Sequence, residues 1–320
     1  MNRVQRQRLG WRIAFFALFV LAPPLDLFRF DLVQGHFILF GLPWTLDLHG
    51  ASPGQAVLNL VLRAFLPLVL VVGAGFWVSW RYGRLYCGWL CPHFSVVETI
   101  NALMRRASGR LSLWDREPLP EVQSDGTEVH PRRVRWVLVA VAVLLFSLLW
   151  SVTLLSYLLP PAEVWGNLVA ATPTRNQAVF LTAATAAFVI EFTLARHLFC
   201  RFGCAVGLFQ SLIWMANRRA LVVGFDRANA VLCADCDKSC EHACPMRLKP
   251  RQIKRRIFTC TQCQQCVQAC ERVNAPRGRA APLQMLSDQC ALDVSERDFG
   301  RRPAVPPDCF HRNGKPGGVG

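Results

Sequence analysis

Residues 233–270, CADCDKSCEHACPMRLKPRQIKRRIFTCTQCQQCVQAC, hold eight cysteines in two runs of four. Two or three residues separate neighbouring cysteines, so one loop can direct three thiolates at one iron–sulfur cluster, and the other run supplies the fourth. Zinc sites also use Cys-x-x-Cys pairs, but two runs of four, with Cys244 followed by Pro245, favour iron–sulfur. The spacing predicts two [4Fe–4S] clusters. Their ligands are Cys233, Cys236, Cys240 and Cys270 for the first, and Cys260, Cys263, Cys266 and Cys244 for the second.

The rest of the chain is apolar enough to predict a membrane domain. Of 320 residues, 52% are hydrophobic, and a bilayer core needs a helix of about 20 apolar residues. The shorter segment His36–Trp44 cannot span and is expected at the membrane interface or as a re-entrant segment. Four segments are predicted to span: Trp11–Leu27, Val57–Trp80, Val134–Leu159 and Gln177–Phe199.

The distribution of positive charge predicts the orientation. All of the 36 Lys and Arg except Arg29, Arg63 and Arg175 lie on one side of these spans. The positive-inside rule assigns that side to the cytoplasm, so both termini and the cysteine runs are expected there. The net charge of +15 then reflects topology, and nucleic acid is not an expected partner. We therefore predict a multi-pass protein of the bacterial inner (cytoplasmic) membrane, with the lipid bilayer as its first partner.

The predicted fold is an α-helical membrane protein with a cytoplasmic, bacterial-type two-cluster ferredoxin domain of α+β class. We expect a transmembrane domain over residues 1–216, the ferredoxin domain over 221–285 and a largely disordered tail over 286–320. The basic stretch Lys249–Arg256, between the two runs, is expected to face solvent or anionic lipid headgroups. Cys290 and Cys309 fit no ligand spacing and are interpreted as unassigned thiols.

Two further cysteine pairs follow predicted spans. The segments RLYCGWLCPHFSVVETI and HLFCRFGCAVGLFQSLI resemble each other, which indicates an internal repeat. The spacing i, i+4 places both sulfurs of a pair on one face of a helix. Three interpretations remain open: incidental buried thiols, redox-active dithiols, or a four-thiolate site for copper, another soft metal or an iron–sulfur centre. The four residues, Cys87, Cys91, Cys200 and Cys204, are called the thiol site below.

Four other residues could contribute to a site. Arg63 and Glu191 lie inside predicted spans, where a charge is costly; we expect them to pair with each other, with quinone binding or proton uptake as the alternative. His93 and His197 lie close to the thiols in sequence and are expected to pack rather than to bind metal. The sequence contains no C-x-x-C-H motif for covalent haem.

The chain resembles the NapH/CcoG group of membrane polyferredoxins, and within it most closely CcoG, which is also called FixG or RdxA. The similar segments are RFDLVQGHFILFGLPW, RLYCGWLCP, CRFGC with GLFQS, and ERVNAPRGRA. The resemblance implies an inner-membrane iron–sulfur protein. In the CcoG branch the implied role is copper reduction for maturation of a haem–copper oxidase; in the NapH branch it is electron passage from quinol toward a reductase.

The chain departs from this pattern in several places. CcoG proteins have a further span and an immunoglobulin-like domain after the ferredoxin segment, and nothing apolar follows Cys270 here. Ala205 replaces a proline that the family usually has after the second cysteine pair. Three residues instead of the commoner two separate Cys236 from Cys240, and Glu271 replaces a proline. These departures leave the eight-cysteine pattern intact but weaken the expectation of a copper-oxidase role.

Two functions remain open at this point. The first is an electron carrier that passes single electrons between the cytoplasmic clusters and the thiol site, a quinone or a partner redox protein. Its reaction would be that of a cupric reductase or of a quinol-linked oxidoreductase subunit. The alternative is a copper- or metal-handling assembly factor in which the clusters are structural, with copper ion and oxidase assembly proteins as partners. The electron donor, the acceptor and the direction of flow stay undetermined.

Overall fold

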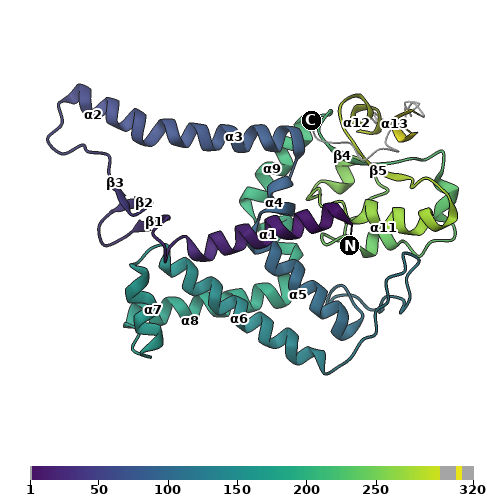
Figure 1. The fold of residues 1–320 in the computed structure, drawn as a ribbon, viewed down its shortest axis with the longest axis horizontal. Helices are drawn as coiled ribbons and strands as arrows, with labels where there is room; N and C mark the ends of the chain where they lie inside the picture. Colours follow the sequence, from purple (N-terminus) through teal and green to yellow (C-terminus); the bar gives the residue numbers. More distant parts are fainter. Residues whose placement is uncertain (1, 296–307, 312–320) are drawn as a thin grey trace. The chain divides into compact units, whose positions relative to one another are not determined.

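The computed structural model of the chain describes residues 2–295 and 308–311 (Figure 1). The chain divides into two compact units, each built from separate stretches of sequence. The first comprises Met1–Leu9, Phe76–Trp136 and His197–Gly320 and contains every cysteine of the sequence; we call it the cysteine unit. The second comprises Gly10–Gly75 and Val137–Arg196, and we call it the helical unit. The division differs from the expected boundary near residue 216, because the thiol site belongs to the same unit as the two cysteine runs.

The helical unit contains a small antiparallel sheet of strand order β1-β2-β3 and most of the long helices. A core cluster of Val152, Leu155, Val164 and Leu181 lies among its helices. Its elements are α1 (Arg3–Leu21), β1 (Phe28–Asp31), β2 (His36–Leu39), β3 (Leu42–Trp44), α2 (Pro53–Leu60), the π-helix η1 (Val61–Phe65), α3 (Leu66–Tyr82), α6 (Arg135–Ser156), α7 (Pro161–Val169), α8 (Arg175–Ile190) and the π-helix η2 (Glu191–Ala195). Helices α1, α3 and α6 each have one end in the cysteine unit.

Capping residues fix where two of these helices begin. The Ser52 hydroxyl accepts from the backbone N–H of Gln55, and the Gln55 side chain accepts from the Ser52 N–H, which forms a capping box before α2. Thr174 and Gln177 form the same box before α8. Each box satisfies two backbone donors that a helix start otherwise leaves unpaired.

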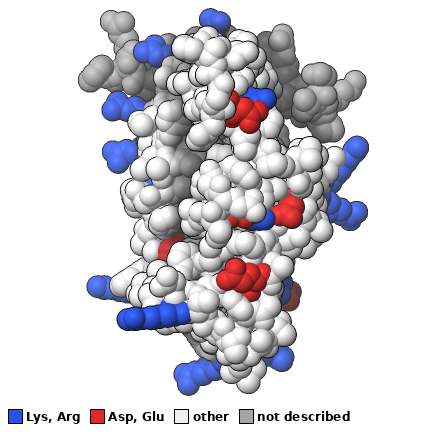
Figure 2. Space-filling view, turned by 90° about the vertical axis from the view of Figure 1, so that its left-hand side faces the viewer, with Lys and Arg blue, Asp and Glu red and all other residues white. Residues whose placement is uncertain are grey.

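Among the described residues, three helices are long and apolar enough to cross a membrane: Pro53–Tyr82, Arg135–Ser156 and Arg175–Ala195. They coincide with the second, third and fourth predicted spans. Their apolar side chains are widely exposed, as for Val71 at 72%, and the face of the protein in Figure 2 is mostly uncharged. Such a surface is costly in water and suits the hydrocarbon of a bilayer. These helices indicate membrane association.

Of the four predicted spans, Trp11–Leu27 agrees least with the helices of the structure. It falls on α1, which begins at Arg3, ends at Leu21 and is not among the three long apolar helices. The basic residues before Trp11 form part of the same helix, while residues 22–26 form turns around Pro23 and Pro24. Proline cannot continue the helical hydrogen bonding, which explains the earlier end.

Two features of the helical unit go beyond what the sequence indicated. The segment His36–Trp44 forms β2 and β3, paired antiparallel, and its place at a membrane interface or as a re-entrant segment stays a prediction. Arg63 does not pair with Glu191. Its guanidinium forms an ion pair with Asp47 and donates to the Thr45 carbonyl at 3.1 Å, because the loop before α2 returns to the turn of helix that carries Arg63.

The cysteine unit combines short helices with an antiparallel strand pair in which Val223 lies opposite Met285. Helices α10 and α11 pack against each other, and α11 packs against β5. The elements are α4 (Leu85–Trp89), α5 (Pro92–Ser108), the π-helix η3 (Phe199–Gly203), α9 (Ala205–Ala216), β4 (Val222–Phe225), η4 (Ala230–Cys233), α10 (Ser239–His242), η5 (Lys254–Ile257), α11 (Gln265–Asn274), η6 (Ala275–Arg277), β5 (Leu283–Leu286), α12 (Asp288–Ser295) and α13 (Asp308–His311).

The predicted disordered tail begins with α12, and residues 296–307 and 312–320 lie outside the described part of the chain. Cys290 of α12 forms a disulfide with Cys309 of α13. The interpretation of these two cysteines as unassigned thiols is therefore wrong. Their distance in sequence from the two runs hid the pairing, because only the folded chain brings α13 next to α12.

Lys254 corrects the expectation of a solvent-facing basic link. Lys249, Arg255 and Arg256 are exposed, but Lys254 is only 3% exposed. Its ammonium donates to the carbonyls of Trp214 at 2.9 Å and Asn217 at 2.6 Å and lies 4.5 Å from the centre of the Trp214 ring. It therefore occupies the carbonyls at the end of α9, where a positive charge is also favoured by the helix dipole.

This lysine should make stability depend on pH. Burial lowers the pKa of Lys254 to about 8 from 10.5. Between these values the unfolded chain binds the proton and the folded chain does not, so the free energy of unfolding should rise as pH increases from about 8 to about 10.5. Denaturation of wild type and Lys254→Met, measured across this range, tests the effect. The substitution should abolish the rise, and an equal rise in both proteins would contradict it.

Candidate metal centres

The first cavity of the cysteine unit is lined by Cys233, Cys236, Cys240 and Cys270. Three of them come from the first run, whereas Cys270 is carried by α11 of the second run. Apolar side chains, Leu232, Val273 and Leu283 among them, complete the wall of this cavity. Arg251 also lines it and pairs with Glu241 at 2.7 Å, which places a positive charge close to the cysteine sulfurs.

The second cavity is lined by Cys244, Cys260, Cys263 and Cys266. Here Cys244 comes from the first run and the other three from the second. The loop between Cys260 and α11 places Gln262 and Gln264 in the left-handed region, with φ of 53° and 61°. These conformations tighten the loop around its sulfurs, and they are rare for residues other than glycine.

Both cavities have the donor set that a [4Fe–4S] cluster requires. Each offers four sulfurs and a mainly apolar wall, and the two sets of four are those that the sequence spacing predicts. Burial raises the pKa of the Cys240, Cys244 and Cys260 thiols to about 12. Without metal these thiols stay protonated at neutral pH, whereas ligation to iron deprotonates them. The residues therefore fit two clusters.

The two halves of the predicted repeat have the same local structure. Cys87 lies in α4 and Cys200 in η3, each a single short helical turn. Cys91 and Cys204 are the N-cap residues of the helices that follow, α5 and α9. The expectation that both sulfurs of a pair share one continuous helix is therefore wrong. Pro92 explains the break in the first copy, because the residue before a proline avoids helical geometry and proline is favoured at the first helical position.

The structure brings the thiols of the two copies close together. Burial raises the pKa of Cys91 to about 12, and the neighbouring sulfurs of Cys87 and Cys204 raise it further. Cys200 is buried, and its carbonyl accepts from the Arg84 guanidinium at 2.7 Å. Among the described residues no group of three or more His, Cys, Asp and Glu side chains is placed to hold a single metal ion. This applies to the thiol site and also to the eight cysteines that line the two cavities.

The histidines near the thiol site have packing environments. The His93 ring lies 5.2 Å from the Phe199 ring, and His197 is buried at 5% exposure. Cys87 has a polar neighbour instead, because the Gln210 side-chain oxygen lies 3.4 Å from its sulfur. Sequence spacing gave no indication of Gln210 or of Arg84.

The loop of the thiol site touches the loop of the second cavity at Gly88. A Cβ atom at this glycine would lie 2.0 Å from the Thr261 carbonyl oxygen, so only glycine permits the contact. Gly88 directly follows Cys87, and Thr261 directly follows Cys260. The Trp89 indole N–H also donates to the Gln262 carbonyl at 3.2 Å.

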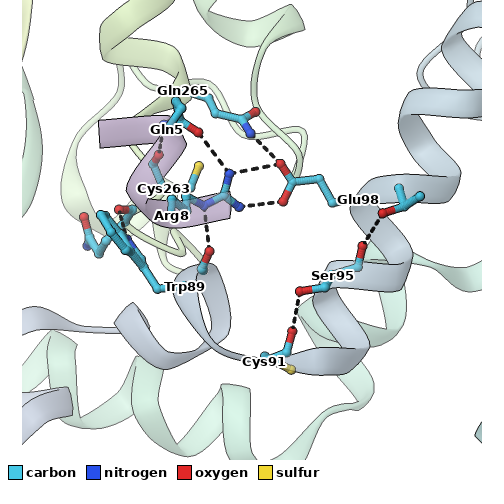
Figure 3. A network of polar contacts seen from close by, with 11 residues as sticks. Gln5, Arg8, Trp89, Cys91, Ser95, Glu98, Cys263 and Gln265 are labelled. Atoms are coloured by element: carbon cyan, nitrogen blue, oxygen red, sulfur yellow. Dashed lines mark hydrogen bonds and ion pairs between the residues drawn. The ribbon is translucent and has the colours of Figure 1, made fainter. Parts of the chain in front are cut away.

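A polar network fixes this contact, as Figure 3 shows. The Arg8 guanidinium donates to the Gly88 carbonyl at 2.7 Å and to both carboxylate oxygens of Glu98, at 3.0 and 2.5 Å. Gln265 donates to the same carboxylate, and the Gln5 amide donates to the Cys263 carbonyl at 2.8 Å. The start of α1, the loop after α4, helix α5 and the second cysteine run are thereby joined by hydrogen bonds that are buried or partly buried.

Replacing Gly88 by alanine should loosen this junction. The new methyl group cannot fit beside the Thr261 carbonyl, and overpacking of this kind typically costs about 1–3 kcal/mol. Increased protease cleavage of the second cysteine run, measured on the metal-loaded protein, would report the effect. Gly73→Ala is the matched control, because no atom lies within 4 Å of a Cβ there. Equal cleavage rates in the two variants would show that the close approach does not matter.

Part of the chain matches a known protein family. A family described as a 4Fe-4S binding domain matches residues 64–110 and 177–221. The first stretch contains Cys87 and Cys91, and the second contains Cys200 and Cys204, so the match coincides with the two copies of the repeat. Neither stretch includes residues 233–270.

Three relatives are similar at low identity. YccM of Escherichia coli, named as a candidate electron transport protein, is 25% identical over 217 residues, which cover 68% of this chain and 54% of YccM. The uncharacterized protein MJ0750 of Methanocaldococcus jannaschii is 26% identical over 277 residues, 85% of this chain and 94% of its own length. RdxA of Cereibacter sphaeroides is 24% identical over 278 residues, 81% of this chain and 53% of RdxA.

The chain thus spans about half the length of YccM and of RdxA. No solved structure matches it. The resemblance noted in the sequence is confirmed: the chain is similar, at low identity, to members of the NapH/RdxA-type polyferredoxin family, and two of its segments match a family described as a 4Fe-4S binding domain.

Proposed function

We propose that this protein is a membrane-bound carrier of single electrons. The observation that carries the proposal is the arrangement of eight cysteines as two sets of four around two cavities. When bound there, [4Fe–4S] clusters would take up and release one electron each. The similarity to YccM and RdxA agrees with a role in electron transport.

The contact between Gly88 and Thr261 supports the thiol site as the next point on the electron's route. Each residue is covalently bonded to a candidate ligand, Cys87 or Cys260, so a single non-bonded contact joins the two sites through the backbone. Arg8 and Glu98 hold the two loops at this separation. We propose that electrons pass between the second cavity and the thiol site at this point.

The three long apolar helices support anchoring in the bacterial inner membrane. The excess of Lys and Arg on one side of the predicted spans supports a cytoplasmic position for the cysteine unit. A carrier in this position can exchange electrons with a quinone, with Cu(II), which is reduced by one electron to Cu(I), or with a partner redox protein. Copper reduction for oxidase maturation is the role that the RdxA branch suggests. The alternative, a copper-handling assembly factor with structural clusters, has the same cysteines but requires no change of cluster oxidation state.

Purification under anaerobic conditions tests the proposal directly. The protein should contain about eight iron and eight sulfide for the two cavities, or more if the thiol site also binds iron. Its cluster EPR signal should appear on reduction with dithionite. Adding Cu(II) or an oxidised quinone to the reduced protein should then remove that signal. A colourless protein that holds zinc would overturn the proposal, and clusters that neither reagent oxidises would exclude both acceptors.

A further inference from the structure

A hollow in the surface of the cysteine unit adjoins the first cavity. The residues that line it are Phe225, Ala230, Cys233, Lys238, Glu241, Lys249, Arg251 and Gln252. Three of these, Cys233, Lys238 and Arg251, also line the first cavity. The hollow and the cavity thus share a candidate cluster ligand and two cations. An electron carrier seated in the hollow would contact residues that surround the first cluster.

The second cavity has different neighbours. Among the described residues, none that lines the second cavity also lines the hollow. Its loop instead contacts the loop of the thiol site, where Gly88 approaches Thr261. The first cavity therefore adjoins an exposed surface, and the second adjoins the thiol site. An electron that leaves the thiol site and passes both cavities would reach the surface at the hollow.

The hollow carries positive charge. Lys238 and Lys249 are exposed, and Arg251 is partly exposed. Glu241 is the one carboxylate among the described lining residues, and it pairs with Arg251 at 2.7 Å. The two lysines therefore give the hollow a net positive charge. Charge of one sign around a concave surface attracts a partner of the opposite sign and accelerates its association.

The fold holds Lys238 in an uncommon conformation. Its φ is 65°, in the left-handed region that lysine rarely adopts. Before it, Asp237 and Ser124 each donate a backbone N–H to the other's side chain, at 3.2 and 3.1 Å. After it, the Glu241 N–H donates to the Lys238 carbonyl at 2.7 Å. Unfavourable backbone conformations of this kind cluster at functional sites, and this one carries an exposed charge.

An exposed apolar residue follows the hollow in sequence. Val231 is 77% exposed. It belongs to η4, in which Ala230 lines the hollow and Leu232 lines the first cavity. Protein interfaces combine apolar contacts with a polar rim, and electron-transfer complexes bury small areas. An apolar residue beside two exposed lysines has the composition expected of a small electron-transfer interface.

We propose that this surface is the docking site of a small acidic protein that carries one electron. The inference rests on the proposed function and adds the chemistry of the partner and the place where it binds. One electron passes between the partner and the cluster of the first cavity. The side that gains it is reduced by one electron and the other is oxidised by one, so no further reagent is required. The first cavity is then the outer end of the electron's route, and the thiol site is the inner end.

Binding to a flavodoxin, which is a small acidic one-electron carrier, tests the surface without any redox reaction. The full-length, cluster-loaded protein in detergent should bind oxidised flavodoxin at low salt, and the affinity should fall as salt is added. Lys238→Glu/Lys249→Glu should weaken binding about tenfold or more. A wild-type protein that does not bind flavodoxin would overturn the inference.

Arg255→Glu/Arg256→Glu is the matched control. It changes the total charge by the same amount, and both arginines are exposed but do not line the hollow. This variant should keep most of the affinity for flavodoxin. Equal losses in the two double variants would mean that only the overall charge of the protein attracts flavodoxin, which would also overturn the inference.

Lys238→Asn separates the charge from its structural setting. Asparagine tolerates the left-handed conformation better than lysine does, so the variant should resist denaturant at least as well as the wild type. It should nevertheless bind flavodoxin more weakly, because the charge is gone. A variant that keeps full affinity would show that Lys238 does not contact the partner.

Electron exchange locates the contact at the first cavity. Protein and flavodoxin are mixed anaerobically, in the direction in which electron flow is favourable, and the cluster absorbance is followed. Lys238→Glu/Lys249→Glu should slow this exchange about tenfold without slowing reduction by methyl viologen, a small cation. Cys270→Ser, which should lack the first cluster, should lose exchange with flavodoxin while its second cluster still accepts electrons from methyl viologen.

The remaining outcomes separate this inference from the proposed function. If Cys270→Ser still exchanges electrons with flavodoxin, the docking site is not at the first cavity. If Lys238→Glu/Lys249→Glu slows reduction by dithionite, a small anion, as strongly as exchange with flavodoxin, the hollow binds small anions and not a protein. Both results leave the proposed function intact. Absence of clusters, or clusters that no reagent reduces, would refute the proposed function instead.

Discussion

Replacing Cys270 by serine should abolish the cluster of the first cavity and spare that of the second, although Cys270 belongs to the second run of cysteines. The side chain lies with Cys233, Cys236 and Cys240, and a cubane that loses one of four thiolates is expected to be lost or to lose iron. The reciprocal variant, Cys244→Ser, should eliminate the cluster held with Cys260, Cys263 and Cys266. Each variant should lose about four of the iron atoms.

EPR spectra of the reduced proteins distinguish the two losses. Cys270→Ser should match Cys236→Ser, and Cys244→Ser should match Cys263→Ser. Cys309→Ser serves as the control, because this residue forms a disulfide with Cys290 and neither cysteine lines a cavity. If Cys270→Ser matched Cys263→Ser instead, each run would bind its own cluster, and the grouping of sulfurs around the cavities would have to be rejected.

Glu98→Ala should have the largest effect on the stability of the junction between the thiol site and the second cavity. Arg8 is 2% exposed and depends on Glu98 for its counter-charge. Removing one partner of a buried ion pair leaves the other charge uncompensated, at a cost of about 3–5 kcal/mol. The variant also leaves the Gln265 amide without its acceptor. Denaturant unfolding in detergent, followed by tryptophan fluorescence, measures the loss.

Asp288→Ala provides the matched comparison. It breaks the pair between Arg81 and Asp288, which is solvent-exposed, and exposed pairs contribute about 0–1 kcal/mol. In the double variant Arg8→Met/Glu98→Ala neither charge remains, so part of the stability should return. Equal destabilisation by Glu98→Ala and Asp288→Ala would mean that the network in Figure 3 does not hold the loops together.

The sequence predicted best what depends on local spacing. Cysteines two or three residues apart must share a loop, and the grouping around the cavities follows from those loops. Uninterrupted apolar runs likewise located the three long helices. The cysteine pairs were harder, because their spacing fits a single helix and only Pro92 signalled the break in the first copy.

Interactions between distant residues were beyond such reasoning. Arg8 belongs to a basic N-terminus and resembles the residues that only set the orientation of a membrane protein, yet it pairs with Glu98. Lys254 belongs to a basic run and looks solvent-exposed, yet it binds carbonyls at the end of α9. A single charged residue in a sequence can be exposed to solvent or paired in the interior of the protein, and only the fold determines which of the two occurs.

The hydrogen bond from Gln5 to the Cys263 carbonyl joins residues 258 positions apart, which has a consequence for the order of assembly. Arg8 can reach Gly88 and Glu98 once about 100 residues have left the ribosome, but Gln5 finds its partner only after nearly the whole chain has been made. Contacts of such long range form late, because loop closure must come first. A chain truncated before residue 260 should therefore keep the contacts of Arg8 and lack that of Gln5, and formation of the Gln5 hydrogen bond would mark a late step of biogenesis.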